Sequence, residues 1–149
     1  MSKIIYTKPD GTVAVVISAS GNISDAIKDV PDSTSYSVVD DSVVPSDRSF
    51  RNAWVGNNIG VSTATISEDI TKAKEIHKTN IRTARTPKLQ ELDIEFQKAQ
   101  ETSAGITTIV AKKQALRDAP AAAGIATAAN TTELKAQWDT SILGDSPYS

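Results

Sequence analysis

The sequence predicts an α+β protein: a small antiparallel β N-terminal head, followed by an α-helical hairpin arm and a short C-terminal helix. Residues 1–66 are rich in Val, Ser and Asp and are divided by Pro and Gly turns, a pattern typical of short strands. Residues 67–119 repeat apolar side chains at helical spacing on both sides of one tight turn. Residues 120–149 are Ala-rich and contain one more short helical pattern. We therefore expect a β-rich head domain, a helical hairpin and an Ala-rich C-terminal segment with these three boundaries.

The head opens with a predicted β-hairpin. Residues 3–7 and 12–17 favour β structure, and residues 8–11 between them are Lys-Pro-Asp-Gly. Proline presets φ early in a turn and glycine accepts a positive φ, so this tetrapeptide predicts a tight turn.

Four further short elements are expected in the head. Residues 24–30 predict two helical turns with Ser24 as the N-cap. Residues 36–39 predict a strand. Residues 49–55 and 59–66 predict a second hairpin around a Gly-Asn-Asn turn.

The arm begins with Ser67, a good N-cap, followed by two acidic residues that the helix dipole favours. Apolar side chains, with one neutral imidazole, then recur at helical spacing, namely Ile70, Ala73, His77, Ile81, Ala84, Leu89, Leu92, Phe96 and Ala99. The step between Ala84 and Leu89 breaks this period, and Pro87 lies within it. Two interpretations remain open: Thr86 caps a new helix that starts at Pro87, or one long helix kinks there. We favour a bent, nearly continuous helix.

The return helix follows a short connection. Residues 102–105, Thr-Ser-Ala-Gly, are few enough to force an antiparallel return. The second helix carries an apolar stripe of Ile106, Ile109, Val110 and Leu116. Pro120 is expected to stop it.

The C-terminal segment predicts less regular structure. Residues 121–129 are an Ala-rich run that we expect to be loosely helical at best. Residues 130–138 predict a short helix capped by Asn130 or Thr131. Residues 142–148 are expected to be irregular.

The composition of the chain argues against several classes of function. The chain of 149 residues has no cysteine and therefore no disulfide, thiol nucleophile or thiolate metal site. Its net charge of −2 does not indicate the strongly basic surface that nucleic-acid-binding proteins usually carry. We recognise no signal peptide or membrane span, and we expect synthesis and folding in a cytoplasm. We expect no cofactor.

Two groups of residues invite a chemical role, and we assign neither one. His77 is the only histidine, but no serine, acid or second histidine has a recognisable relation to it, so we expect a histidine on the helix surface or at the edge of the core. Asp40, Asp41 and Asp47 surround a turn, but their spacing matches no metal-binding loop, and aspartate is also a common turn residue. We expect no enzyme activity and no metal.

The arm segregates its charges. A basic block of Lys72, Lys74, Lys78, Arg82, Arg85 and Lys88 precedes an acidic block of Glu91, Asp93, Glu95 and Glu101. The blocks are either solvated helix faces or complementary surfaces that align between neighbouring copies. Phosphate binding by the basic block is a further possibility, but it has no interleaved aromatic residues for base stacking.

Four stretches, taken in order, resemble a known class of proteins. They are the segment 3–11 with its following valines, the segment 47–54, the arm segment 73–89, and Lys112-Lys113-Gln114-Ala115-Leu116-Arg117-Asp118-Ala119-Pro120. This order resembles small proteins encoded in the structural gene clusters of tailed bacteriophages. The Lys-x-x-Leu-Arg-Asp-x-Pro element with a downstream Trp is similar to phage tail-fibre assembly proteins.

The resemblance implies a phage tail-associated protein. Our first hypothesis is a structural protein of the virion, in the tail or tail-fibre region, that is assembled in the host cytoplasm. Under this hypothesis we expect other tail or fibre proteins and further copies of the chain as partners, and neither nucleic acid nor membrane. The alternative is a tail-fibre assembly chaperone that does not remain in the virion. The Ala-rich stretch after Pro120 is longer than the spacing we associate with such chaperones.

We predict protein contacts at two places. In the head they are Phe50, Arg51 and Trp54, and on the arm they are Arg82, Arg85 and Lys88. Tryptophan and arginine are frequent interface anchors. The alternative for the three head residues is that they belong to the core.

Overall fold

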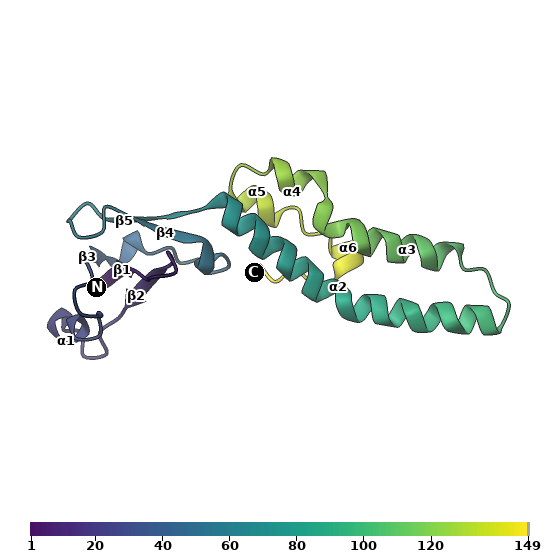
Figure 1. The fold of residues 1–149 in the computed structure, drawn as a ribbon, viewed down its shortest axis with the longest axis horizontal. Helices are drawn as coiled ribbons and strands as arrows, with labels where there is room; N and C mark the ends of the chain where they lie inside the picture. Colours follow the sequence, from purple (N-terminus) through teal and green to yellow (C-terminus); the bar gives the residue numbers. More distant parts are fainter. Residues whose placement is uncertain (149) are drawn as a thin grey trace. The chain divides into compact units, whose positions relative to one another are not determined.

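The computed structural model describes residues 1–148 and confirms the α+β class, with antiparallel sheets followed by helices (Figure 1). The chain forms two compact units, Met1–Ala73 and the part from Lys74 onward. The division falls in the first turn of the longest helix. We describe each unit by itself.

The predicted first hairpin is confirmed. Strand β1 (Ser2–Thr7) pairs antiparallel with β2 (Val13–Val16), with Thr7 opposite Val13. Gly11 has φ of +81°, the left-handed conformation that the Lys-Pro-Asp-Gly turn requires of its glycine. The Asp10 carboxylate accepts hydrogen bonds from the Thr12 hydroxyl and backbone N–H, which lower the pKa of this carboxyl.

The predicted strand at 36–39 is also confirmed and completes a three-stranded sheet. Strand β3 (Tyr36–Asp40) pairs with the other edge of β1, so the strand order is β2-β1-β3. Helix α1 (Ile23–Ile27) contacts β1. Its N-cap is Asn22, whose side chain accepts from the Ser24 N–H, so the prediction of Ser24 as the cap is wrong.

The second hairpin exists, but its strands differ from the prediction. Strand β4 (Trp54–Asn57) pairs antiparallel with β5 (Thr65–Glu68). A short 3₁₀-helix η2 (Arg51–Ala53) replaces the predicted start of the first strand, and another, η1 (Asp41–Val43), follows β3. The predicted turn residue Gly56 instead lies within β4, where a Cβ atom would come within 2.8 Å of the Ile59 side chain.

The core of the head lies between the two sheets. Strand β1 is buried on both faces, because Ile4 and Ile5 are consecutive and both are fully buried. A hydrophobic cluster gathers around Ile5 and Trp54, and its other buried members are Val13, Val39, Val44 and Ala64. Burial of these apolar side chains is the main term that holds the head together.

Helix α2 (Ile70–Glu101) starts later than predicted. Ser67 is not its N-cap, because Ser67 pairs with Val55 in the second hairpin. Asp69 takes this role: its carboxylate accepts from the N–H groups of Thr71 and Lys72.

Helix α2 continues through Pro87, so the interpretation with a new helix capped by Thr86 is wrong. Pro87 has no N–H to donate to the Thr83 carbonyl. Three threonine hydroxyls in this part of α2 each donate to a carbonyl one helical turn earlier: Thr79 to Glu75, Thr83 to Thr79, and Thr86 to Arg82. Figure 1 shows α2 changing direction near its middle, as a proline and such threonines favour.

The predicted antiparallel return is confirmed in helix α3 (Thr107–Asp118), which lies beside the second half of α2 (Figure 1). Lys113 joins the two helices: its ammonium forms an ion pair with Asp93 and lies 5.1 Å from the centre of the Phe96 ring. Part of the acidic block is thus neutralised within the chain.

The C-terminal segment contains more helix than predicted. After a 3₁₀ turn η3 (Ala119–Ala121) come α4 (Ala123–Thr127), α5 (Thr131–Lys135) and α6 (Thr140–Leu143). Asn130 caps α5, as one of the two predicted alternatives, and α6 occupies a region expected to be irregular.

Candidate functional site

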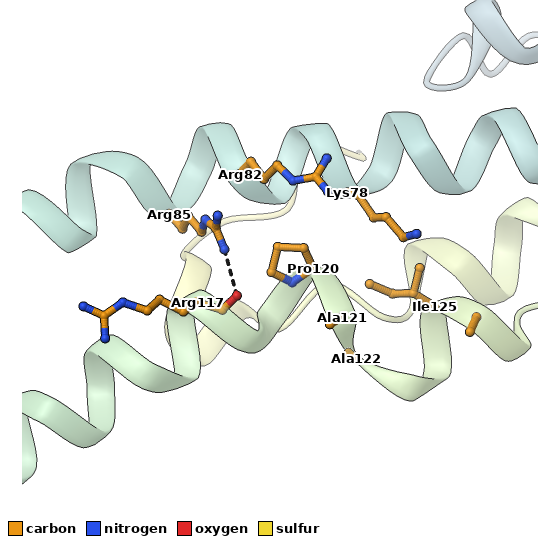
Figure 2. Close-up of a pocket in the computed structure, with 9 residues that line it drawn as sticks. Lys78, Arg82, Arg85, Arg117, Pro120, Ala121, Ala122 and Ile125 are labelled. Carbon is orange, nitrogen blue, oxygen red and sulfur yellow. Dashed lines mark hydrogen bonds between the residues drawn. The ribbon is translucent and has the colours of Figure 1, made fainter.

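A basic pocket lies between α2 and the chain that follows α3. Its volume is about 380 Å³, and no acidic side chain lines it among the described residues. Figure 2 shows cationic side chains from α2 on one side of Pro120 and small apolar residues on the other. Its lining residues are Lys78, Arg82, Arg85, Arg117, Pro120, Ala121, Ala122, Ile125 and Ala126. We call this the basic pocket.

Helix α2 supplies three of the four cations. Lys78, Arg82 and Arg85 are separated by four and then three residues, which places them on one face of the helix. The neighbouring face carries His77 and Ile81, which are both buried, and His77 contacts Tyr148 and Trp138 of the C-terminal segment. Packing of that apolar face therefore sets the direction in which the basic face points.

Arg85 links helix α2 to helix α3 at the edge of the basic pocket. Its guanidinium donates to the Arg117 carbonyl at 2.8 Å and to the Leu116 carbonyl at 3.3 Å. These carbonyls belong to the last turn of α3, where the helix dipole favours a positive charge. Arg85 thus has a structural role, and the contact holds its guanidinium in place beside the pocket.

The other cations of the pocket make fewer interactions within the chain. Lys78 forms an ion pair with Glu75 at 3.0 Å, whereas the Arg82 and Arg117 side chains have no hydrogen bond or ion pair among the described residues. In Figure 2 the Arg82 guanidinium lies over the pocket near Pro120, while that of Arg117 points away from it. Lys78 and Arg82 are therefore the two cations that face the pocket and have hydrogen-bond donors left for a ligand.

The floor of the pocket is apolar and well supported. Pro120 and Ile125 are both buried. On the outer side, the Lys74 ammonium donates to the Ala126 carbonyl at 2.7 Å and joins α2 to α4. The arrangement can hold an anion above a small apolar surface.

The predicted arm residues divide between two places. Arg82 and Arg85 meet in the basic pocket, but Lys88 lines a different depression of about 280 Å³, together with Glu91, Glu95 and Lys112. From the sequence, Lys78 belonged to the basic block but not to the predicted contacts, and no contact was predicted for Arg117. The helical spacing of Lys78 with Arg82 and Arg85 was a usable signal, whereas nothing local pointed to Arg117.

The predicted head residues also divide. Phe50 and Trp54 are 1% and 0% exposed and belong to the core of the head, so their side chains offer no surface to a partner. We therefore retain only the exposed Arg51 as a candidate contact of the head. Large aromatic side chains are common both in protein cores and at interfaces, so the residue type alone could not show which of these locations Phe50 and Trp54 occupy.

His77 lies inside the second unit rather than on its surface. It is fully buried, its Nδ1 lies 2.7 Å from the Tyr148 hydroxyl, and its ring stacks on that of Tyr148. Trp138 packs edge-on against both rings. The Nε2 atom of His77 has no hydrogen-bond partner among the described residues, and burial lowers the pKa of the His77 imidazole. The histidine joins α2 to the C-terminal segment.

The three aspartates considered above for a metal site, Asp40, Asp41 and Asp47, make other contacts within the head. Asp40 accepts from the Ser42 N–H, which lowers the pKa of its carboxyl, and Asp47 accepts from the Ser49 N–H. Asp41 forms an ion pair with Lys3, which lowers the pKa of Asp41. Over residues 1–148, no three side chains of His, Cys, Asp or Glu gather as a metal site would require.

No helix in the described part of the chain combines the length and apolar character needed to cross a membrane. Comparison with known proteins found no match to this chain among protein-family models, curated proteins or solved structures.

Proposed function

We propose that the protein is a structural component of a bacteriophage virion, in the tail or tail-fibre region, where it mediates attachment and assembly through protein–protein contacts. The order of sequence motifs that resembles phage tail-associated proteins supports this proposal. The observation that carries it is the basic pocket between α2 and the segment that follows α3, where a cluster of cations is open to a partner.

The hairpin offers a second kind of contact surface. Ile94 on α2 is 53% exposed and Val110 on α3 is 45% exposed. Single exposed apolar residues are common, and we propose that these two contact a neighbouring chain. They support assembly into a larger structure, including assembly with further copies of the chain.

The first experiment is mass spectrometry of purified particles of the phage that encodes the protein. Peptides from this chain at a fixed ratio to the tail proteins are expected, and their copy number will give the symmetry of attachment. Absence from particles, with abundance in infected lysate, would favour the alternative, a tail-fibre assembly chaperone. Absence from both contradicts the proposal.

A second experiment tests the contact residues. Replacement of Arg51 or Arg82 by Ala is expected to reduce incorporation into particles without unfolding the protein, because both side chains are exposed. Lys98→Ala is the matched control, because it removes an exposed positive charge that lies outside the predicted contacts. Equal incorporation of all three variants would remove Arg51 and Arg82 from the contact surface.

A further inference from the structure

We propose that the basic pocket binds the carboxylate groups of an acidic segment of a partner protein. The inference names the chemistry of the partner in the attachment function proposed above and rests on that function. It identifies Lys78 and Arg82 as the cations that contact the segment.

The charges in the pocket are not balanced within the described chain. Lys78, Arg82 and Arg85 converge on one helix face, and over residues 1–148 the only carboxylate paired with any of them is Glu75, which binds Lys78 from outside the pocket lining. Like charges that converge in this way repel one another. An anion that enters the pocket removes this repulsion and forms charge-assisted hydrogen bonds.

The pocket is partly organised before a ligand arrives. Arg85 is held by two carbonyls at the end of α3, and Lys74 ties α4 to α2. Only Lys78 and Arg82 need to become ordered, which limits the entropy lost on binding. A guanidinium also matches the planar geometry of a carboxylate with two parallel hydrogen bonds.

The size and floor of the pocket fit a short piece of protein. Its volume of about 380 Å³ lies in the range typical of sites for small ligands, so it accommodates one or two side chains. The buried Pro120 and Ile125 provide an apolar floor for the methylene groups of a glutamate.

The surroundings disfavour nucleic acid as the ligand. No aromatic side chain lines the pocket among the described residues, so bases have no ring on which to stack. Farther along α2 lie Glu91 and Glu95, both exposed, which would repel a phosphate backbone that continues past the pocket. A short acidic segment of a protein ends before this repulsion becomes large.

The test is fluorescence anisotropy with the full chain and a fluorescein-labelled hexaglutamate peptide, at low and at physiological ionic strength. The comparison probes are labelled hexaglutamine, an oligothymidylate with the same number of charges, and unlabelled inorganic phosphate as a competitor. Hexaglutamate is expected to bind more tightly than both labelled comparison probes, and phosphate is expected to compete only weakly.

The variant Lys78→Gln/Arg82→Gln is expected to weaken hexaglutamate binding at least about tenfold, because two charge-assisted hydrogen bonds are lost. The matched control is Lys98→Gln/Lys112→Gln, which removes the same charge from exposed positions outside the basic pocket and is expected to leave the affinity within about twofold. If thermal unfolding shows that the double pocket variant is destabilised, Arg82→Gln alone carries the test, because this side chain is exposed and makes no bond within the described chain.

The inference would be overturned by an absence of hexaglutamate binding, by equal loss in the pocket and control variants, or by tighter binding of the oligothymidylate. Competition by phosphate as strong as that by unlabelled hexaglutamate would also overturn it, because the pocket would then be a general oxyanion site. The attachment function is judged separately by mass spectrometry of particles, so a virion component that fails the peptide test would lose only the pocket assignment.

Discussion

Pro87 provides the sharpest test of the arm, because it lies inside the continuous helix α2 and its side chain is exposed. The perturbation is Pro87→Ala. Alanine restores an N–H that can donate to the Thr83 carbonyl and removes the ring that crowds this carbonyl. The substitution therefore raises the free energy of unfolding if α2 is one helix in solution.

The expected size of the gain has two limits. The full difference in helix propensity between proline and alanine, about 3 kcal/mol, is the upper limit. The bend of α2 has already relieved part of the clash, and the restored hydrogen bond alone contributes about 1 kcal/mol, which is the lower limit. A gain of about 1–3 kcal/mol raises the melting temperature of the helical unit by at least about 4 °C.

The assay is equilibrium urea denaturation followed by far-ultraviolet circular dichroism, which reports mainly on the helices of the second unit. Pro31→Ala is the matched control: Pro31 is exposed in a loop of the head, so its removal adds no helical hydrogen bond. This control is expected to be neutral or to lose about 0.4–1 kcal/mol. A Pro87→Ala protein that unfolds at the wild-type urea concentration would refute the reasoning that α2 continues unbroken through Pro87.

Three other predictions concern stability. Burial lowers the pKa of His77 below the usual value for a histidine, about 6.5, so the unfolded chain binds this proton more strongly. The free energy of unfolding should therefore fall by up to about 1.4 kcal/mol per pH unit as pH drops below about 6.5, and urea titrations of His77→Leu should lose that slope. Asp69→Ala should cost about 1 kcal/mol in urea denaturation, while Asp69→Asn, which keeps a capping oxygen, should cost less; equal losses would contradict the capping role. Ile81→Ala should cost about 2–5 kcal/mol, whereas Val61→Ala should change stability by less than about 0.5 kcal/mol, and thermal melts that rank the two in reverse would contradict the assigned burial.

Elements set by neighbouring residues could be predicted from the sequence. The Lys-Pro-Asp-Gly turn, the return at residues 102–105 and the cap of Asn130 on α5 each depend on side chains and backbone within a few positions. The apolar stripe of α2 was predictable for the same reason, because a helix repeats its own face every three to four residues. Ala73, His77 and Ile81 are accordingly buried.

The sequence by itself therefore determined the α+β class, the order from the strands of the head to the long helix and its antiparallel return, and the basic face of α2. Tertiary structure decided where α2 begins, because the pairing of Ser67 with Val55 extends β5 and leaves the cap to Asp69. It also placed Trp54 in a core and brought Tyr148 onto His77, 71 residues away. The basic pocket belongs to this second group, since the position of Pro120 beside Arg82 and Arg85 depends on the packing of distant segments. Local preferences act between residues close in sequence, whereas such contacts arise only when the whole unit buries its apolar surface.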